Sequence, residues 1–482
     1  MKLNELLPGV LCPALEVGGL CDQSQAVRPG DVFFALAGTR CHGLEFIYDA
    51  QARGAIAVVY DLESEVNVPL NIPAIAVPQL KERLGEIAAR FYGHPSRDIE
   101  VIGVTGTNGK TSCSLFLAQI LKGGVLGTLG WGRPGVLQPS LHTTAPAIET
   151  QRRLNELRGQ GIKVVVMEVS SHALEQGRVN GIDFRLALWT NLSRDHLDYH
   201  CTMEAYLEAK QKLFAWPTLE AAVLNLDDPA WPHFYQVVAP GVTVVGYGTK
   251  AHESLLFPRV TAAEVHYGAA GMRFEALWGQ ERAPVEVPLL GEFNLANVLA
   301  VLAVLLARGW QLVEAAEHLR TIQPVPGRME CFRAEGWPLV VVDYAHTPAG
   351  LESALNAVRR HVHGKVWVVF GCGGERDRGK RPLMGKIAEQ LADYVILTDD
   401  NPRSEPGDRI IADIRAGMVS LPRIIRDRAE AIATAVTSAS PEDVVLIAGK
   451  GHEDYQEIEG VRKPFSDRAL VAELLNEAAI CV

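Results

Sequence analysis

The residues with the clearest chemical purpose in this 482-residue chain form a glycine-rich loop, Gly-Val-Thr-Gly-Thr-Asn-Gly-Lys-Thr-Ser, at positions 103–112. The loop follows a short apolar strand and opens a helical segment, which is the context that a phosphate-binding loop requires. Glycines let the backbone approach phosphates, and N–H groups at a helix N-terminus attract negative charge. We expect Lys110 to neutralise the outer phosphates of a nucleotide and Thr111 to place its hydroxyl on Mg²⁺.

The loop is a variant, because the strict phosphate-loop pattern has glycine where this chain has Val104. The alternative interpretation is a glycine-rich turn that binds nothing. Lys110 and Thr111 come directly after Gly109, between a strand and a helix, and this arrangement favours phosphate binding over that alternative.

A second group of candidate residues follows the apolar strand at 164–168, which ends in Glu168. Ligands of parallel sheets bind at the carboxyl ends of the strands, so Glu168 is a candidate oxygen ligand for a hard cation. A carboxylate at an exposed strand end is the alternative. His196 and His200 have an i, i+4 spacing that could bind zinc, but the glutamate of a His-Glu-x-x-His motif is not present. The phosphate loop therefore favours Mg²⁺ over zinc.

Strand-like and helical segments alternate along the chain, and this alternation predicts an α/β protein with buried parallel sheets. Turn-forming residues near 94–97 and 322–328 suggest three domains. These are a small α/β N-terminal domain at 1–97, a central P-loop-type parallel-sheet ATPase domain at 98–325 and a C-terminal Rossmann-like domain at 326–482. In the last domain we expect strands at 339–342, 366–370, 394–397 and 444–447, and helices at 350–361 and 428–438.

The composition is that of an ordinary globular protein, because 48% hydrophobic and 21% charged residues exclude a disordered or collagen-like chain. The net charge of −11 argues against broad nucleic-acid binding. The longest wholly apolar run, at 298–307, is much shorter than the roughly 20 residues that span a membrane. Eight scattered cysteines without a Cys-x-x-Cys pair, and an N-terminus without a signal-peptide pattern, predict a cytoplasmic protein.

Further motifs follow the phosphate loop in a fixed order. They are Met-Glu-Val-Ser-Ser-His at 167–172, Thr-Asn-Leu-Ser-Arg-Asp-His-Leu-Asp-Tyr-His at 190–200, Tyr-x-x-Ala-Lys at 206–210, Gly-Glu-Phe-Asn-Leu-Ala-Asn at 291–297, Pro-Gly-Arg-Met-Glu at 326–330, Asp-Tyr-Ala-His-Thr-Pro at 343–348, Gly-Gly-Glu-Arg-Asp at 373–377, Asp-Asn-Pro-Arg at 400–403 and Gly-Lys-Gly-His-Glu at 449–453. Together these motifs resemble the Mur ligases, the ATP-dependent amino-acid-adding enzymes of peptidoglycan synthesis. The resemblance spans most of the chain.

The resemblance implies a ligase that joins the free D-Glu carboxylate of UDP-MurNAc-L-Ala-D-Glu to an amine. A carboxylate is a poor electrophile, so ATP first converts it to an acyl phosphate, which the amine then attacks. Negative charge accumulates in both steps, and cations and N–H donors are expected to supply most of the catalysis. The implied catalytic residues are Lys110, Glu168, His196 and Lys210.

The resemblance also implies two Mg²⁺ sites, one at Thr111 and Glu168 and the other at His196 and Lys210, with Lys210 modified to a carbamate. Carbamylation requires a neutral amine, so we expect Lys210 to occupy a partly desolvated pocket that depresses its pKa. Without the resemblance, an ordinary helical lysine that contacts Tyr206 would be an equal alternative.

Binding residues follow from the resemblance as well. For ATP they are Gly106, Thr107, Asn108, Gly109, Lys110, Thr111, Ser112, Asn294, Arg328, Asp343 and His346. For the UDP-MurNAc-dipeptide they are Ser24, Thr143, Thr144, Ser170, Gln176 and Arg178. The first domain departs from the family pattern, because Gln-Ser-Gln at 23–25 stands where the family usually has Asp-Ser-Arg.

The incoming amino acid is implied to bind at Arg376, Asp400, Asn401, Pro402, Arg403, Gly449 and Glu453. Meso-diaminopimelate differs from L-lysine by a carboxylate on its distal carbon, and arginine can bind a carboxylate through two parallel hydrogen bonds. Arg403 follows a proline-stiffened turn and fits this role, while Glu453 suits the distal ammonium. A solvated loop arginine is the alternative. We therefore expect meso-diaminopimelate to be the added amino acid.

Other functions stay open from the sequence. A related Mur-type ligase would add L-lysine or D-Ala-D-Ala, and a P-loop ATPase of a different class would act as a switch without forming an amide. A folate polyglutamate synthetase is disfavoured, because its loop typically continues Lys-Gly-Ser where this chain has Lys110, Thr111 and Ser112. We expect small-molecule partners only (the UDP-MurNAc-dipeptide, meso-diaminopimelate and ATP), no nucleic acid, no membrane span and a monomer.

Overall fold

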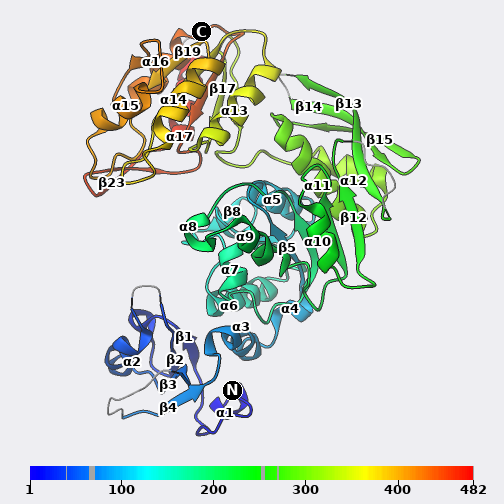
Figure 1. The fold of residues 1–482 in the computed structure, drawn as a ribbon, viewed down its shortest axis with the longest axis vertical. Coiled ribbons are helices and arrows are strands. Elements are labelled where there is room, and N and C mark those ends of the chain that lie inside the picture. Colours follow the sequence, from blue (N-terminus) through cyan, green and yellow to red (C-terminus); the bar gives the residue numbers. More distant parts are fainter. Residues whose placement is uncertain (39–40, 64–70, 251–255, 269–270, 481–482) are drawn as a thin grey trace. The chain divides into compact units, whose positions relative to one another are not determined.

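The computed structural model describes all residues except 39–40, 64–70, 251–255, 269–270 and 481–482. The chain divides into two compact units, Met1–Tyr247 with His252–Pro258 and Gly248–Ala251 with Arg259–Val482. Figure 1 shows the elements of both units, and each unit is described by itself. Among the described residues, no helix is long and apolar enough to cross a membrane.

The first unit begins with a small parallel sheet in the order β1-β2-β3-β4. Val32 and Phe34 of β2 belong to one core cluster, and Phe33 and Ala35 belong to another. Because alternate side chains point to opposite faces, this strand is buried on both sides. The elements are α1 (Leu3–Leu6), β1 (Gly19–Cys21), β2 (Asp31–Ala35), α2 (Ile47–Ala52), β3 (Ala57–Asp61), β4 (Ala74–Val77), α3 (Leu80–Phe91) and α4 (Pro95–Asp98), with short 3₁₀ turns at Ser24–Ala26 and Gly43–Phe46.

The first unit continues with strands of a larger sheet, which run in the order β12-β11-β10-β5-β9-β6-β7-β8. The strands from β12 to β6 are parallel, while β7 and β8 are antiparallel additions. The strands are β5 (Glu100–Thr105), β6 (Gly124–Gly127), β7 (Gly130–Arg133), β8 (Val136–Gln138), β9 (Val164–Glu168), β10 (Phe184–Trp189), β11 (Ala221–Asn225) and β12 (Thr243–Tyr247). The helices are α5 (Lys110–Ile120), α6 (Ala147–Gly159), α7 (Ser171–Glu175), α8 (Leu197–His200), α9 (Met203–Gln211) and α10 (Trp231–Val237).

Three neighbouring strands of this sheet position the candidate site. β5 pairs with β10 on one side and with β9 on the other, all in parallel. Their carboxyl ends therefore lie at one edge of the sheet, where the phosphate loop, Glu168 and Thr190 follow β5, β9 and β10. This edge is where ligands of parallel sheets bind.

The second unit contains three antiparallel strands, β13 to β15, and a mostly parallel sheet. β14 pairs antiparallel with β13 and β15, and the second sheet has the order β16-β17-β21-β18-β19-β20 with only β16 antiparallel. The strands are β13 (Arg259–Gly268), β14 (Gly271–Trp278), β15 (Glu281–Val287), β16 (Glu330–Phe332), β17 (Leu339–Asp343), β18 (Val366–Phe370), β19 (Tyr394–Leu397), β20 (Arg423–Ile424), β21 (Val444–Ala448) and the hairpin of β22 (Tyr455–Ile458) and β23 (Val461–Pro464). The helices are α11 (Glu292–Ala307), α12 (Leu312–Leu319), α13 (Pro348–His361), α14 (Lys380–Leu391), α15 (Gly407–Arg415), α16 (Arg428–Ser438) and α17 (Asp467–Ile480).

The predicted α/β class with parallel sheets is confirmed. The strands expected at 366–370 and 394–397 and the helix expected at 428–438 match β18, β19 and α16 to the residue. The antiparallel strands β13 to β15 were not expected. The side chains of β15 alternate between exposed and buried from Arg282 to Val287, so this strand carried a period-two pattern that the sequence analysis did not use.

Candidate active site

The phosphate loop connects β5 to α5, and its conformation depends on two glycines. Gly106 (φ +148°) and Gly109 (φ +84°) have backbone angles that L side chains rarely adopt. Lys110 begins α5, and its Nζ donates to the carbonyl oxygens of Gly106 at 2.7 Å and Thr107 at 2.9 Å. The loop thus combines a helix N-terminus with an ammonium held over the backbone, which suits a polyphosphate.

Residues after β10 hold the loop from the other side. Asn108 donates its backbone N–H to Oδ1 of Asn191 at 2.9 Å, and Thr107 donates its backbone N–H to the Asn191 carbonyl oxygen at 2.9 Å. The Thr190 hydroxyl donates to the Asn108 carbonyl oxygen at 2.6 Å. These bonds fix the loop between two strands of the sheet.

Glu168 is buried directly beside the phosphate loop, with 1% of its surface exposed. Its Oε2 accepts hydrogen bonds from the hydroxyls of Thr111 and Thr128, both at 3.0 Å, and its Oε1 accepts from the Thr128 backbone N–H at 2.9 Å. Burial raises the pKa of Glu168, and the charge of Lys110 with the three hydrogen bonds opposes this shift. A carboxylate and two hydroxyls therefore meet directly beside the phosphate loop.

This donor set fits magnesium. Mg²⁺ prefers oxygen ligands and is usually held by one or two carboxylates together with substrate phosphates. In the part of the chain that the structure describes, no group of three or more His, Cys, Asp or Glu residues forms a ready-made metal site. A cation at Thr111 and Glu168 would therefore be shared with a bound phosphate.

Lys210 lies in α9 and is almost completely buried, with 1% of its surface exposed. Its Nζ donates to the Gly106 carbonyl oxygen at 3.0 Å and lies 4.4 Å from the centre of the Tyr206 ring. Burial lowers the pKa of Lys210 well below its usual range; Lys110 lowers it further, and Asp195 opposes the shift. Lys110 and Lys210 thus donate to the same carbonyl oxygen, and their charges repel each other.

His196, predicted to bind a cation, and His200, which was considered with it as a zinc pair, have different surroundings. The His200 ring is buried, and its Nε2 lies 2.9 Å from the Ser171 hydroxyl, which suits a structural role. The His196 side chain is half exposed, and its ring centre lies 6.1 Å from that of Tyr206. Both histidines contact the ring of His172. His196 and the buried lysine of α9 therefore flank the same tyrosine.

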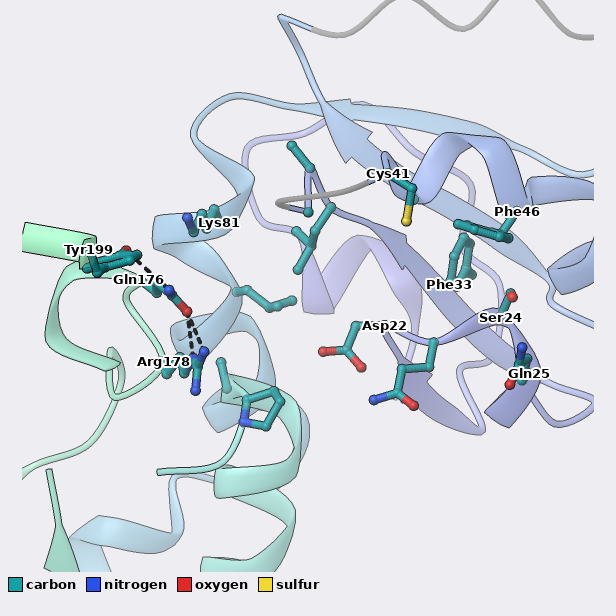
Figure 2. A pocket seen from close by; sticks show the side chains of 18 residues that line it. Asp22, Ser24, Gln25, Phe33, Cys41, Phe46, Lys81, Gln176, Arg178 and Tyr199 are labelled. Atoms are coloured by element: carbon teal, nitrogen blue, oxygen red, sulfur yellow. Dashed lines mark hydrogen bonds between the residues drawn. The ribbon is translucent and has the colours of Figure 1, made fainter. Parts of the chain in front are cut away.

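A cavity of about 660 Å³ in the first unit contains three of the residues predicted to bind the UDP-MurNAc-dipeptide, Ser24, Gln176 and Arg178 (Figure 2). Arg178 donates through Nε to Gln176 Oε1 at 2.8 Å and through Nη1 to the Thr144 carbonyl oxygen at 3.0 Å. Gln176 in turn donates to the Tyr199 hydroxyl at 3.1 Å. The guanidinium is therefore oriented by neutral partners inside a cavity large enough for a nucleotide-sized ligand.

The remaining three of these residues connect the cavity to the cation site. Thr144 donates its hydroxyl to the Glu168 carbonyl oxygen at 2.9 Å and accepts from the Ser170 backbone N–H at 3.0 Å. The Thr143 hydroxyl lies 3.0 Å from that of Thr128, which also binds Glu168. The structure thus brings the predicted substrate residues of the first unit into one connected region.

In the second unit, three of the predicted ATP residues lie together at the end of β17. Asp343 is buried and accepts a hydrogen bond from the Met329 backbone N–H at 2.8 Å. Burial raises the pKa of Asp343, and the positive charge of Arg328 opposes this increase. The Arg328 guanidinium lies 4.5 Å from the centre of the Tyr344 ring, and His346 Nδ1 lies 2.8 Å from the Tyr344 carbonyl oxygen. Arg328 Nε is buried without a hydrogen-bond partner among the described residues.

Asn294, which is also predicted to bind ATP, makes its side-chain hydrogen bonds within its own segment. It belongs to the first turn of α11, where its Nδ2 donates to the Leu290 carbonyl oxygen at 2.8 Å and its Oδ1 accepts from Asn297 at 3.0 Å. Both polar atoms are engaged locally, and none of these bonds connects Asn294 to Asp343.

The predicted amino-acid-binding residues follow the carboxyl ends of neighbouring strands of the second unit. Arg403 has a left-handed backbone (φ +53°) and is held by the hairpin, since its N–H donates to the Glu457 carbonyl oxygen and its own carbonyl accepts from Glu459. Arg403 Nη1 donates to the Gly374 carbonyl oxygen at 2.7 Å. The exposed Arg376 belongs to that same loop.

The other members of this set surround Asn401, which is 3% exposed. Asn401 Nδ2 donates to Glu453 Oε2 at 2.8 Å, and Asp400 Oδ1 accepts from the Asn401 backbone N–H at 2.8 Å. Gly449 (φ +119°) donates its N–H to the Asp343 carbonyl oxygen at 3.1 Å, so the predicted nucleotide and amino-acid residues of this unit are neighbours.

Comparison with known proteins shows the family to which the chain belongs. Three family models match the chain: the Mur ligase family catalytic domain at 16–92, the Mur ligase middle domain at 104–305 and the Mur ligase glutamate ligase domain at 327–451. The UDP-N-acetylmuramoyl-L-alanyl-D-glutamate–2,6-diaminopimelate ligase of Alkalilimnicola ehrlichii is 51% identical over 476 residues, which cover 96% of this chain and 95% of that protein. The chain belongs to the Mur ligase family.

Other Mur ligases agree with this assignment. The enzyme of the same name from Pseudomonas aeruginosa is 47% identical over 98% of this chain and 98% of its own. A solved structure with the same enzyme name is 37% identical, covers 99% of both chains and superposes with a TM-score of 0.75. The prediction of a ligase from the sequence motifs is confirmed.

Sequence reasoning missed three residues of this Mur ligase that hold site groups in place. Thr128 follows β6, which lies next to β9, and a strand prediction at 124–127 would have placed it beside Glu168. Asn191 and Lys450 lie inside recognised motifs but received no role. Lys450 lies two residues after the end of the buried strand β21, and this is the available signal for a site position.

Proposed function

We propose that this Mur ligase adds meso-diaminopimelate to the D-Glu carboxylate of UDP-MurNAc-L-Ala-D-Glu and converts ATP to ADP and phosphate. The observation that carries the proposal is the 51% identity, over 96% of the chain, to a relative named for this reaction. The γ-phosphoryl group of ATP is transferred to a carboxylate oxygen. The amine then attacks the acyl carbon, phosphate leaves, and the amine loses a proton.

For ATP we propose the phosphate loop, with Lys110 over the outer phosphates. The proposed residues are Gly106, Thr107, Asn108, Gly109, Lys110, Thr111 and Ser112 in the first unit and Asn294, Arg328, Asp343 and His346 in the second. The loop geometry supports the first group, because its helix N-terminus and Lys110 attract anions. Arg328 Nε supports the second group, because it is buried without a hydrogen-bond partner among the described residues and a ligand acceptor would satisfy it.

We further propose that Mg²⁺ assists the reaction, held by Thr111 and Glu168 at one site and by His196 and Lys210 at another. The oxygen donors around Glu168 support the first site. When bound, Mg²⁺ would neutralise phosphate charge at these positions. Lys110 binds the same charge directly, and it would act on the phosphoryl group throughout transfer.

For Lys210 we propose the carbamate. Two ammonium groups on the Gly106 carbonyl oxygen repel each other, and burial favours a neutral Lys210 amine, which is the form that reacts with CO₂. The product is an anion beside Lys110, so repulsion becomes attraction. Intact-protein mass spectrometry under CO₂ with chemical trapping tests this proposal. An unmodified Lys210 in fully active enzyme would contradict it.

The proposed substrate residues for the UDP-MurNAc-dipeptide are Ser24, Thr143, Thr144, Ser170, Gln176 and Arg178. Their support is the connected path from the cavity to Glu168. For meso-diaminopimelate we propose Arg376, Asp400, Asn401, Pro402, Arg403, Gly449 and Glu453. Arg403 would bind the distal carboxylate and Glu453 the distal ammonium.

We also propose that the chain works as a cytoplasmic monomer with domains at 1–97, 98–325 and 326–482. Light scattering tests the oligomeric state.

Release of phosphate tests the proposed function. With purified enzyme, ATP and Mg²⁺, phosphate should be released only when both the UDP-MurNAc-dipeptide and meso-diaminopimelate are present. Steady release with ATP alone would instead indicate a P-loop ATPase switch. Release that requires the dipeptide but responds equally to L-lysine or to D-Ala-D-Ala would indicate a related ligase.

A further inference from the structure

Lys450 is a completely buried lysine between two residues that we propose for amino-acid binding. Its side chain is 0% exposed, and its Nζ donates to Asn401 Oδ1 and to Glu453 Oε2, both at 3.0 Å. The Tyr455 ring also packs against the ammonium group, with its centre 5.4 Å from Nζ. A buried ammonium is costly unless it is paired, and here its partners are the two site residues themselves.

Lys450 determines which way the Asn401 amide faces. Asn401 Oδ1 accepts from Lys450 Nζ at 3.0 Å and from the Glu457 backbone N–H at 2.9 Å. Both partners are donors only, so the amide oxygen must face them. The amide nitrogen is thereby turned toward Glu453, to which it donates at 2.8 Å.

The same contacts orient the Glu453 carboxylate. Lys450 Nζ and Asn401 Nδ2 both bind Oε2, and Oε1 of Glu453 has no hydrogen-bond partner among the residues that the structure describes. The Glu453 side chain is 20% exposed while that of Lys450 is 0% exposed, so the carboxylate lies between the buried cation and the surface. One oxygen is fixed and the other is available to a ligand cation.

We propose that Lys450 is a positioning residue that selects amino acids with a distal ammonium. It fixes Glu453 so that Oε1 binds the distal ammonium of meso-diaminopimelate, while Arg403 binds the neighbouring carboxylate. This inference rests on the proposed function, because it assigns the distal ammonium to Glu453. Lys450 acts through Glu453, which it binds directly and orients by way of Asn401, and it does not touch the reacting atoms.

Steady-state kinetics of Lys450→Met with two amino acids test the inference. Meso-diaminopimelate carries the distal ammonium, whereas L-2-aminopimelate has the same chain and distal carboxylate without it. The wild-type preference for meso-diaminopimelate in kcat/KM should fall at least about tenfold in the variant, which is the scale of a hydrogen bond to a charged group. The loss should appear in KM for meso-diaminopimelate, with KM for ATP unchanged. Lys463→Met is the matched control, because Lys463 is an exposed lysine on the neighbouring β23.

A double variant keeps the test valid if Lys450→Met folds poorly. Lys450→Met with Glu453→Gln removes both charges, and it should show the same amino-acid preference as Glu453→Gln alone, because Lys450 acts through Glu453. Equal losses on both amino acids, or a further loss of preference in the double variant, would overturn the inference. If the wild-type enzyme forms no product with meso-diaminopimelate, the proposed function itself fails, whatever the variants do.

Discussion

The phosphate loop of the first unit and the amino-acid region of the second handle buried charge differently. Around the loop, the described hydrogen bonds of Glu168 come from hydroxyls and a backbone N–H, and the Nζ atoms of Lys110 and Lys210 donate to backbone carbonyls. Around the amino-acid region, buried cations are paired with carboxylates, as in Lys450 with Glu453. The charged side chains at the phosphate loop are therefore available to a ligand, whereas the buried cations of the second unit bind carboxylates of their own loops.

The second unit contains two more such pairs. Arg428 and Asp467 are both 0% exposed and joined by two hydrogen bonds of 2.7 and 2.8 Å. Arg428 also donates to the Ala448 carbonyl oxygen at 3.1 Å, next to Gly449. Arg381, likewise 0% exposed, binds Glu405 and the Gly373 carbonyl oxygen. In the second unit, ion pairs between side chains hold the loops in place. At the phosphate loop, the Glu168 carboxylate is held by neutral hydrogen-bond donors, so its charge remains available to a bound cation.

The largest expected effect is on the folding of the second unit. Arg428→Met leaves Asp467 buried without its cation, and we expect a loss of about 3–5 kcal/mol in the free energy of unfolding of this unit. Hydrogen exchange of β21 peptides in denaturant measures it. Arg415→Met, at an exposed position of α15, is the control. Arg428→Met combined with Asp467→Leu should recover most of the lost stability. An unchanged free energy of unfolding in Arg428→Met would contradict the role of ion pairs in this unit.

Lys110→Met should give the next largest effect, on catalysis and not on folding. The ammonium over the phosphates is lost, so kcat should fall by roughly 10²–10³. The unfolding midpoint should change little, because the hydrogen bonds of Lys110 Nζ to the Gly106 and Thr107 carbonyl oxygens lie within the loop itself. Phosphate release and urea unfolding give the two readouts, with the exposed Lys163→Met as control. A variant that loses stability but keeps kcat would show that Lys110 serves folding and not catalysis.

Arg403→Ala should affect the choice of amino acid. Removal of the guanidinium should lower kcat/KM for meso-diaminopimelate by about 10–100-fold, the range for hydrogen bonds to a charged group. L-Lysine has no distal carboxylate, so its slower turnover should not change. Coupled ADP assays with both amino acids measure this, with Arg415→Ala as control. Equal losses with both amino acids would show that Arg403 only supports the loop.

The smallest expected effect concerns pH and Glu168. Burial raises the pKa of Glu168, so its contribution to stability is present at acid pH and is lost as pH rises through the raised value. Glu168→Gln should therefore make the stability of β9 less dependent on pH above the ordinary range of a glutamate. It should also remove the protection that Mg²⁺ with ATP gives to β9 in hydrogen exchange. Identical pH profiles for the two proteins would refute this.

Much of this arrangement was predictable from sequence, for a physical reason. The strand β9 and the phosphate loop are local patterns, in which apolar runs and glycines report directly on burial and backbone angle. The Lys450–Asn401–Glu453 network was not predictable, because it joins residues about 50 positions apart through the order of β21, β18 and β19. The spacing of residues along the chain does not predict the order of these strands in the sheet. The pairing of Arg428 with Asp467 was missed for the same reason.

A one-pot competition tests the central claim most directly. The enzyme is given the UDP-MurNAc-dipeptide, ATP and Mg²⁺ with equal concentrations of meso-diaminopimelate, L-lysine and D-Ala-D-Ala, and the nucleotide products are weighed by mass spectrometry. We predict that nearly all product carries one diaminopimelate joined by a new amide. A comparable amount of lysyl or D-alanyl-D-alanyl product, or ATP hydrolysis without any amide, would contradict the account.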